Sequence, residues 1–525
     1  MQIIKLIVLT AMIVGCSQTH KQKTMNELTK DSQTLLRSNL EFLASDELEG
    51  RETTKRGARI AAQYIASQLK QYGVKPFGDD GTYFQNFDLQ SQRFQPSSKL
   101  VLYNNKKEKS LTFIDNFVPI LAGKTIDNSQ MVYLKYGVTD SISNYDDYAG
   151  IDVKGKTVVC LSGVPEGDEE FKKRMGNKHW GRSTTKTKWA KKKGAVAVFI
   201  LSSTYYMKRW ERYSKYFSKE RIGRIREENE EAISAAWLDS VAIKDLFNLG
   251  NITYTQLYDT LKAGYIKPGM NLGSVSMEIK KESKIVNARN VVGIVDGNDK
   301  SLDNELVTVG AHYDHEGIKG GKVYNGADDN GSGTVAILES ARQMSATKSN
   351  KRPIVYVFHA AEEKGLLGAY YFTNHFERFD DVIVNINMDM VGRGSTDTIF
   401  AVGSGMISSE FFDIVEEANK ESANFVFDYT LDDENHKSRI YYRSDHWAFA
   451  KKGVPVVFFT IDGHPDYHKP TDDVEKINFP KLDKVARLAS QIALKVANLD
   501  HKLIVDNAKI TGTNKKKEEQ NSPTQ

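Results

Sequence analysis

From residue 288 onward, short apolar runs alternate with stretches of helical spacing. The apolar runs lie at residues 291–295, 306–311, 354–358, 382–388 and 454–460, and the helical patterns include residues 334–344 and 480–499. Strands that alternate with helices build a layered domain around a largely parallel sheet. We therefore predict an α/β fold over residues 286–505, with a mixed, mostly parallel central sheet flanked by helices.

The rest of the chain divides by composition. Residues 27–95 are predicted to be the N-terminal part of the same domain, with helical spacing from residue 35 to residue 72 and a stop at Gly73. Residues 96–285 are richer in short β-like runs and predict an inserted β-rich domain; the runs lie at residues 99–103, 131–135, 157–161 and 195–201. Residues 506–525 hold few apolar side chains and predict a disordered tail.

The N-terminus has the pattern of an export signal. Lys5 precedes a short apolar run, residues 6–14, which is too short to span a bilayer as a mature helix. The run ends in Ile-Val-Gly-Cys at residues 13–16, which resembles a bacterial lipoprotein signal box. This resemblance implies a signal peptide at residues 1–15, lipidation of Cys16 and a tether at residues 16–26. The product would be an exported bacterial lipoprotein, membrane-anchored through that lipid, in the periplasm or at the cell surface. The alternative is an ordinary secretory signal with an incidental cysteine.

Charge and cysteine content exclude several classes of protein. Lys and Arg number 72 against 68 Asp and Glu, and a net charge of +4 is too close to neutral to predict nucleic acid as a partner. The chain has 2 cysteines, which excludes a disulfide scaffold and a four-cysteine zinc site.

Two motifs are rejected on their context. Residues 150–157 fit the P-loop pattern, but a strand-like run follows them where a P-loop requires a helix, so we predict no nucleotide site. Residues 208–226 mix basic and aromatic side chains, but acidic residues follow directly. We interpret this segment as a solvated helix or loop with one packed face.

Four of the predicted strands end at ionisable residues. The side chains at or just after the strand ends are His312 and Asp314, then Glu362 and Glu363, then Asp389, and finally Tyr467 and His468. A loop after the first of these strands adds Asp328 and Asp329. Ligands of open α/β sheets bind beyond the carboxyl ends of the strands, so these side chains are expected on one rim. Imidazole and carboxylate suit zinc, and two metal ions that share a carboxylate can activate water for hydrolysis.

This set of residues resembles the co-catalytic zinc aminopeptidase family, which also includes glutamate carboxypeptidases, glutaminyl cyclases and the transferrin receptor ectodomain. Residues 43–51 resemble the start of that peptidase domain, and residues near 100–280 resemble its inserted protease-associated domain. The resemblance implies the zinc exopeptidase fold and two zinc ions per chain.

The resemblance also implies a role for each site residue. One zinc ion would be held by His312 and Asp389, the other by Glu363 and His468, and Asp329 would bridge the two. Glu362 would be the general base, and Asp314 would orient the imidazole of His312. Tyr467, Asp445 and His446 would be wall or oxyanion contacts, and the peptide bond between Asp329 and Asn330 would be cis.

The function that follows is a metallo-exopeptidase, and an aminopeptidase that removes N-terminal residues from peptides is favoured. A carboxypeptidase or dipeptidase stays open, because Arg393, Lys437, Arg439 and Arg443 could form a basic pocket for a C-terminal carboxylate. A non-catalytic surface binding module, with a vestigial site that need not hold two zinc ions, also stays open. The sequence lacks HExxH and Gly-x-Ser-x-Gly, which argues against thermolysin-type and serine hydrolases.

Overall fold

The computed structural model describes residues 29–104, 107–227, 232–247, 252–433 and 436–511. The chain divides into unit 1, made of Met1–Phe87 and Asn287–Gln525, and unit 2, Asp88–Val286. The sequence placed the inserted domain at residues 96–285. The predicted signal peptide and tether lie outside the described residues. No helix among the described residues has the length and apolar character needed to cross a membrane.

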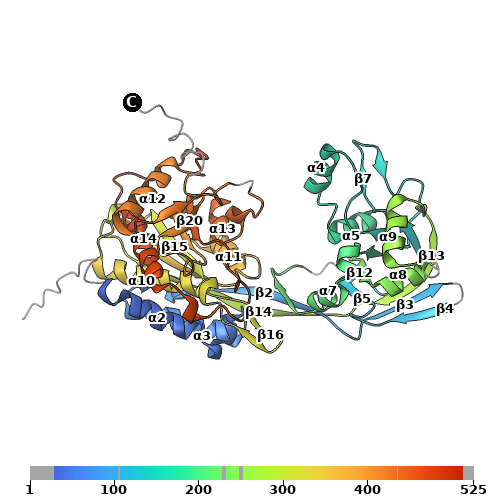
Figure 1. Cartoon of the computed structure of the whole chain (residues 1–525), viewed down its shortest axis with the longest axis horizontal. Helices are drawn as coiled ribbons and strands as arrows, with labels where there is room; N and C mark the ends of the chain where they lie inside the picture. The colour runs from blue at the N-terminus through green and yellow to red at the C-terminus, as the bar shows by residue number, and fades with distance from the viewer. Residues whose placement is uncertain (1–28, 105–106, 228–231, 248–251, 434–435, 512–525) are drawn as a thin grey trace, which may run out of the picture. The chain divides into compact units, whose positions relative to one another are not determined.

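Unit 1 is built around a mixed sheet (Figure 1). Its strands lie in the order β14 (Lys281–Val295), β18 (Ile354–His359), β15 (Leu306–His312), β19 (Val382–Met388), β22 (Val456–Thr460), β20 (Thr398–Val402) and β21 (Val426–Asp428). The four strands from β18 to β22 run parallel to one another, whereas β14 and β20 are antiparallel to their neighbours in this group. The predicted α/β fold with a mixed, mostly parallel sheet is confirmed.

Helices cover both faces of this sheet. One layer contains α2 (Ser32–Leu43), α3 (Arg56–Gln71), α10 (Gly333–Thr347) and α14 (Phe479–Ala497), and the other contains α11 (Leu367–His375) and α13 (His446–Ala450); α12 (Ser409–Ser422) packs on α14. Alternation along β18 explains the two layers. The hydroxyl of Tyr356 lies 3.1 Å from that of Ser340 on α10, whereas Val355 joins the apolar cluster that contains Phe372 of α11 and Phe449 of α13.

Two expectations about unit 1 are corrected. The helical pattern over residues 35–72 forms two helices, α2 and α3, because residues 46–51 form a turn in which Glu49 and Gly50 have positive φ. The predicted disordered tail is wrong for residues 506–511. The amide of Asn507 donates to the carbonyl of Ile407 and that of Ile510 donates to Gly405. Residues 512–525 lie outside the described part.

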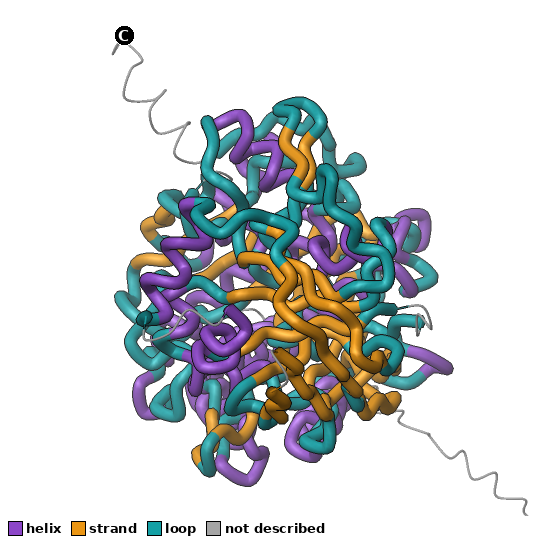
Figure 2. Tube along the Cα trace, turned by 90° about the vertical axis from the view of Figure 1, so that its right-hand side faces the viewer, coloured by secondary structure: helices purple, strands orange, loops and turns teal. Residues whose placement is uncertain are grey.

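Unit 2 has its own sheet and its own helices. The strands lie in the order β4 (Lys107–Leu111), β3 (Lys99–Asn104), β13 (Asn271–Glu278), β6 (Ile126–Leu134), β9 (Thr157–Leu161), β10 (Ala197–Leu201), β12 (Ser234–Leu238) and β5 (Phe117–Leu121). Strands β6, β9, β10 and β12 are parallel, so this unit is itself α/β in character. Its helices are α4 (Glu169–Asn177), α5 (Ser183–Lys192), α6 (Thr204–Met207), α7 (Trp210–Phe217), α8 (Ser240–Phe247) and α9 (Tyr254–Ala263). Figure 2 distinguishes these strands and helices by colour.

The remaining strands are short or connect the two units. The chain passes between the units along β2 (Phe84–Phe94) and β14, and β11 (Arg221–Gly223) pairs with the part of β2 in unit 2. Short antiparallel pairs are formed by β7 (Thr139–Asp140) with β8 (Tyr145–Asp146), by β16 (Gly317–Lys319) with β17 (Lys322–Tyr324), and by β1 (Lys75–Pro76) with β14.

Candidate metal centre and active site

The carboxyl ends of the central parallel strands deliver the predicted side chains to one rim of unit 1. Strand β15 ends at His312, and Asp389 directly follows β19. Glu362 and Glu363 follow β18 after two alanines, and His468 lies in the segment after β22. Because β18, β15, β19 and β22 are neighbours in the sheet, these side chains converge.

One group of side chains gathers around His312. Its Nε2 lies 3.4 Å from Asp389 Oδ1, 3.6 Å from Asp329 Oδ1 and 3.9 Å from Glu362 Oε2. The Nδ1 of the same ring lies 3.1 Å from the carbonyl oxygen of Asp314. A proton on Nδ1, donated to that carbonyl, leaves the Nε2 lone pair facing the carboxylates, as a metal ligand requires.

A second group gathers around His468. Its Nε2 lies 3.1 Å from Asp329 Oδ2 and 3.3 Å from Glu363 Oε2. The two oxygens of Asp329 therefore face different histidines, Oδ1 toward His312 and Oδ2 toward His468. A carboxylate in this position can bridge two cations, and the structure brings together all five side chains that the resemblance assigned to metal.

His315 belongs to this group although the sequence motifs do not predict it. This side chain is fully buried, and its Nδ1 lies 3.0 Å from Glu363 Oε1 and 3.7 Å from Asp329 Oδ2. Together with Asp329 and Glu363 it forms a group that could hold a metal ion. The available signal was its position, three residues after His312 at the end of the same strand. Glu316, the next residue, lies 3.3 Å from His468 Nδ1.

Several buried atoms of this site have no hydrogen-bond partner within the described part of the chain. They are Nε2 of His312, both ring nitrogens of His315, Oε1 of Glu363 and Oδ1 of Asp389. Buried polar atoms are normally paired, so unpaired nitrogen and carboxylate oxygen atoms that converge are the expected signature of a cation site. The donor set of imidazole and carboxylate fits zinc.

The electrostatics of the site follow from burial and from the density of carboxylates. Burial raises the pKa of Glu362 well above its usual value, and the neighbouring Glu363 and Asp389 add to the shift, although His312 opposes it. Burial acts to lower the pKa of His468, but hydrogen bonds with Asp329 and Glu363 outweigh this effect and raise it to about 9. The site as a whole therefore favours positive charge.

Asp314 supports the segment that carries Glu362. Its Oδ1 accepts from the backbone N–H of Glu362 (3.1 Å), and its Oδ2 accepts from the hydroxyl of Thr53 (2.6 Å). The same hydroxyl accepts from the N–H of Ala361 (3.1 Å), a residue with a φ of 60°. The carboxylate of Asp314 is 3.7 Å from His312 Nδ1, farther than the Asp314 carbonyl. Asp314 therefore positions the loop of Glu362 with its carboxylate and the imidazole of His312 with its backbone carbonyl.

Arg51 ties the loops of the rim together. Its fully buried guanidinium donates to the backbone carbonyls of Leu43, Tyr313, Asn325 and Gly326. Two of these carbonyls lie just before the loop that contains Asp329. The resemblance of residues 43–51 to the start of the peptidase domain thus has a structural reason. This segment supplies the buried guanidinium of Arg51, whose N–H groups bond to the loops of the rim.

The predicted substrate contacts divide into one partly exposed residue and two buried ones. Tyr467 is 37% exposed and stacks on the ring of His468, with ring centroids 3.9 Å apart. Asp445 and His446 are fully buried, so their predicted contact with substrate is corrected. His446 packs on Phe458 and its Nε2 lies 2.8 Å from the carbonyl of Tyr441.

The carboxyl group of Asp445 is fully buried, and its pKa is strongly raised. Burial raises its pKa to about 8, an effect that His312 opposes and that Asp389 and Asp314 increase. The preceding residue, Ser444, donates from Oγ to Asp389 Oδ2 (2.8 Å) and accepts from the side-chain amide of Asn387 (3.0 Å). Ser444 thereby orients a predicted metal ligand.

The loop of Asp329 has the backbone that the resemblance implies. The peptide bond between Asp329 and Asn330 is cis, which confirms that expectation. Asn330 fixes the loop to the sheet, because its side-chain amide donates to the carbonyl of Met388 and its Oδ1 accepts from the amides of Gly333 and Met390.

The comparisons with known proteins agree with this geometry. Residues 290–493 match Peptidase family M28. The segment that matches includes every residue assigned to metal and Glu362, which confirms the resemblance drawn from the motifs.

The relatives of this M28 segment include proteins named aminopeptidases. A probable leucine aminopeptidase of Arthroderma benhamiae is 29% identical over 206 residues, which cover 37% of this chain and 54% of that protein. Aminopeptidase YwaD of Bacillus subtilis is 28% identical over 212 residues, which cover 39% of this chain and 43% of that protein. The chain thus spans about half the length of the curated relatives it matches.

The fold extends beyond the M28 segment. The solved structure of an aminopeptidase from Aneurinibacillus sp. strain AM-1 superposes with a TM-score of 0.56 at 21% identity, covering 92% of this chain and 98% of that one. At this identity the likeness concerns the fold alone, and it includes unit 2 as well as unit 1.

Proposed function

We propose that the chain is a zinc-dependent aminopeptidase that holds two zinc ions per chain and uses Glu362 as general base. The observation that carries the proposal is the position of Asp329. Its two carboxylate oxygens face His312 and His468, and Glu362 lies beside His312. The match to Peptidase family M28 and the names of the relatives, which are aminopeptidases, support the reaction class.

Each metal position would include at least one side chain with an unpaired buried atom among the described residues, namely His312 and Asp389 at one position and Glu363 at the other. His312 and Asp389 would hold one ion, Glu363 and His468 the other, and Asp329 would contact both. His315 is close enough to Glu363 and Asp329 to be a further ligand at the second metal position. Zinc bound here supplies Lewis acidity toward a peptide carbonyl and lowers the pKa of water.

Glu362 would move the proton. Its carboxylate is partly buried beside His312, and its backbone N–H donates to Asp314, so the side chain is held at the metal position without being one of the assigned ligands. A carboxylate in a buried site has a pKa raised toward neutrality, which suits a base that accepts a proton from water and returns it to the leaving amine. Tyr467, at the partly exposed edge, would contact the substrate.

The charge of the site favours an N-terminal ammonium group over a C-terminal carboxylate as the recognised end. Carboxylates crowd the rim, and Arg393, the first basic candidate for a carboxypeptidase pocket, is paired with Asp466 at 2.8 Å and lies 3.5 Å from Asp472. Lys437, Arg439 and Arg443 are the other basic candidates. A carboxypeptidase or dipeptidase of the same family is thus the second candidate.

The test is hydrolysis of a panel of aminoacyl chromogenic amides by wild type, Glu362→Ala and the surface control Glu377→Ala. Chelation should abolish release and zinc should restore it, and Glu362→Ala should lose release while it keeps its metal. Metal analysis should find two zinc ions per chain, fewer in Asp329→Ala. Release by Glu362→Ala at the wild-type rate would contradict the proposed base.

Two other outcomes select the alternatives. Two bound zinc ions without amide release, but with cleavage of N-acetylated peptides that have a free C-terminus, would establish a carboxypeptidase. A chain that neither cleaves peptides nor binds metal would be a non-catalytic surface binding module.

We further propose that the chain is exported and anchored in a membrane through a lipid on Cys16. The support is the sequence of residues 1–16, with Lys5 before an apolar run that ends at Gly15-Cys16. Incorporation of a labelled fatty acid that is lost in Cys16→Ser would support the anchor. Incorporation that persists in Cys16→Ser would contradict it.

A further inference from the structure

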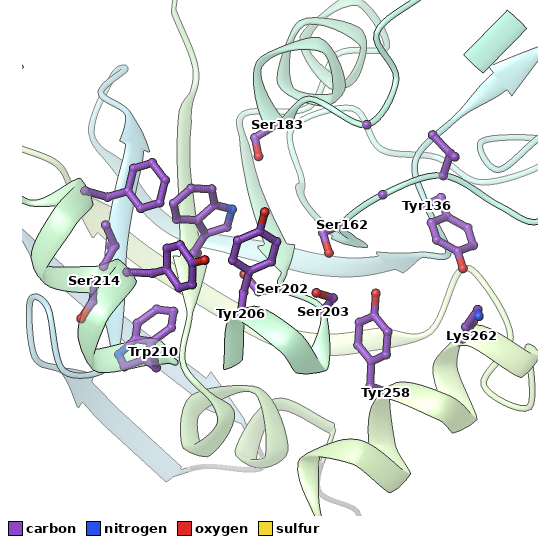
Figure 3. Close-up of a pocket in the computed structure, with 17 residues that line it drawn as sticks. Tyr136, Ser162, Ser183, Ser202, Ser203, Tyr206, Trp210, Ser214, Tyr258 and Lys262 are labelled. Atoms are coloured by element: carbon purple, nitrogen blue, oxygen red, sulfur yellow. The ribbon is translucent and has the colours of Figure 1, made fainter. Parts of the chain in front are cut away.

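Unit 2 contains a cavity of about 580 Å³ whose walls combine aromatic rings with serine hydroxyls (Figure 3). The volume lies within the roughly 300–1,000 Å³ typical of small-molecule sites. All residues that line the cavity belong to unit 2, so it is separate from the zinc site proposed in unit 1.

The cavity lies at the carboxyl ends of parallel strands. Ser162 directly follows β9, and Ser202 and Ser203 directly follow β10, its parallel neighbour. Crevices at the carboxyl ends of strands are where open α/β sheets bind their ligands. Unit 2 thus places a lined cavity where its topology predicts a binding site.

Aromatic side chains of α6, α7 and β12 form one wall. Tyr206 packs edge-on against Tyr213 at 4.8 Å, and Phe217 packs edge-on against Trp237 at 4.4 Å. The indole N–H of Trp210 donates to the backbone carbonyl of Asp115 at 2.7 Å, which fixes the ring. Rings that are held by one another present rigid flat surfaces to a ligand at little entropic cost.

This wall explains the basic and aromatic stretch at residues 208–226. Within α7 the rings of Trp210, Tyr213 and Phe217 line the cavity, while Lys215 and Tyr216 on the same helix are exposed. The expected packed face exists, and it borders a cavity.

The opposite wall offers hydroxyl groups. Ser162, Ser183, Ser202 and Ser203 line the cavity, and across the described chain none of their hydroxyls takes part in a hydrogen bond. Figure 3 shows the hydroxyls of Ser162, Ser203 and Tyr258 directed toward the same space. Each hydroxyl can donate and accept, so the wall suits a ligand with many groups of the same kind.

The charge of the lining selects an uncharged ligand. Among the described residues that line the cavity there is no carboxylate, and the one cation among them, Lys262, is paired with Glu166 at 2.6 Å. The N-terminus of a peptide would find no carboxylate among these residues, and a C-terminus would find only a lysine that is already paired. An apolar side chain would cover the aromatic wall but would leave the serine hydroxyls buried and unpaired, at a cost of about 1–3 kcal/mol for each such group.

We propose that this cavity binds a short, uncharged oligosaccharide. The apolar faces of sugar rings would stack on Tyr206 and Trp210, and sugar hydroxyls would bond to Ser162, Ser202 and Ser203. Rigid aromatic planes beside unpaired hydroxyls match both the apolar faces and the hydroxyl groups of a pyranose.

The experiment is titration calorimetry of the full-length protein with maltotriose, cellotriose and triacetylchitotriose, accompanied by tryptophan fluorescence, since Trp210 and Trp237 line the cavity. At least one trisaccharide should bind with a change in fluorescence. Tyr206→Ala should weaken binding about tenfold, because one stacked ring is lost. Ser203→Ala, a smaller change, should weaken it severalfold. Tyr216→Ala on the same helix, 65% exposed and outside the lining, is the matched control and should bind as wild type does.

Thermal unfolding and cleavage of a small chromogenic amide provide the remaining controls, and all three variants should match wild type in both. Absence of binding for all three trisaccharides would overturn the proposal. Binding that is unchanged in both Tyr206→Ala and Ser203→Ala would place the sugar elsewhere and overturn it too. Tighter binding of the capped peptide acetyl-Ala-Tyr-Ala-amide than of any trisaccharide, lost in Tyr206→Ala, would assign the cavity to peptides instead.

Discussion

The most direct test of how this site is held together is Thr53→Val. Valine has nearly the shape of threonine, so the substitution removes the hydroxyl without leaving a large cavity. Thr53 is 1% exposed, and its hydroxyl joins the carboxylate of Asp314 to the N–H of Ala361. Both partners are fully buried, so water cannot replace the lost bonds.

The magnitude follows from the two bonds. A hydrogen bond to a charged group contributes about 1.5–3 kcal/mol, and a buried amide left unpaired costs about 1–3 kcal/mol. We expect Thr53→Val to lower the free energy of unfolding by about 3–5 kcal/mol. At roughly 2–4 °C per kcal/mol for a domain of this size, Tm should fall by about 10 °C. Since Asp314 also holds the amide of Glu362, kcat should fall by about 10–100-fold.

The assays are urea unfolding, thermal unfolding and amide hydrolysis, with Thr53→Ser as the matched control. Serine keeps the hydroxyl and loses one methyl group, so it should stay within about 1 kcal/mol of wild type. If Thr53→Val and Thr53→Ser were equally stable and equally active, the hydroxyl group of Thr53 would contribute neither to stability nor to activity, and the reasoning would be refuted.

Three further predictions concern the same rim. Arg51→Lys should lower the free energy of unfolding by about 3 kcal/mol, measured by urea unfolding, because an ammonium cannot reproduce a planar fork that serves four carbonyls. Ser444→Ala should weaken zinc affinity about 10–100-fold in a chelator competition, since it removes the donor that orients Asp389. The metal-free protein should lose stability as the pH rises from about 4 to about 8. Burial raises the pKa of Asp445 to about 8 in the folded state, so the folded chain binds the extra proton in this window. Chemical unfolding against pH should show that slope, and Asp445→Asn should make it less steep, while Glu362 and His468, whose pKa values are also raised, retain the rest.

The strand ends could be predicted because they are marked by a pattern in the local sequence. A buried parallel strand is a continuous apolar run, and an ionisable residue at its end marks where the chain reaches the rim. Strands β9 and β19 have the predicted bounds, and His312, Glu363 and Asp389 occupy the places expected of them. The convergence of these side chains could therefore be predicted from the strand pattern together with the family motif.

Contacts between residues far apart in the chain are not marked by any such local pattern. Thr53 and Asp314 are 261 residues apart, and nothing in the local sequence of either residue indicates the other. The family resemblance implies substrate contacts for Asp445 and His446, but motif spacing does not encode the direction of a side chain, and both side chains are fully buried. His315 was not predicted because the family resemblance already assigns a full set of ligands, including the nearby His312.

The segment before the insertion is as much a part of the site as the strands that carry the ligands. The match to Peptidase family M28 begins at residue 290, yet the donors that hold the rim come from Arg51 and Thr53. Helix α2 also packs on α10 and α14, so residues 29–87 complete the core of unit 1. A chain that began at residue 286 would contain every assigned ligand but would leave the carbonyls of Tyr313 and Gly326 and the carboxylate of Asp314 without these buried donors. The unit of folding in this protein is therefore longer than the unit of sequence resemblance, because the strands carry the predicted ligands and the N-terminal segment holds the neighbouring loops in place.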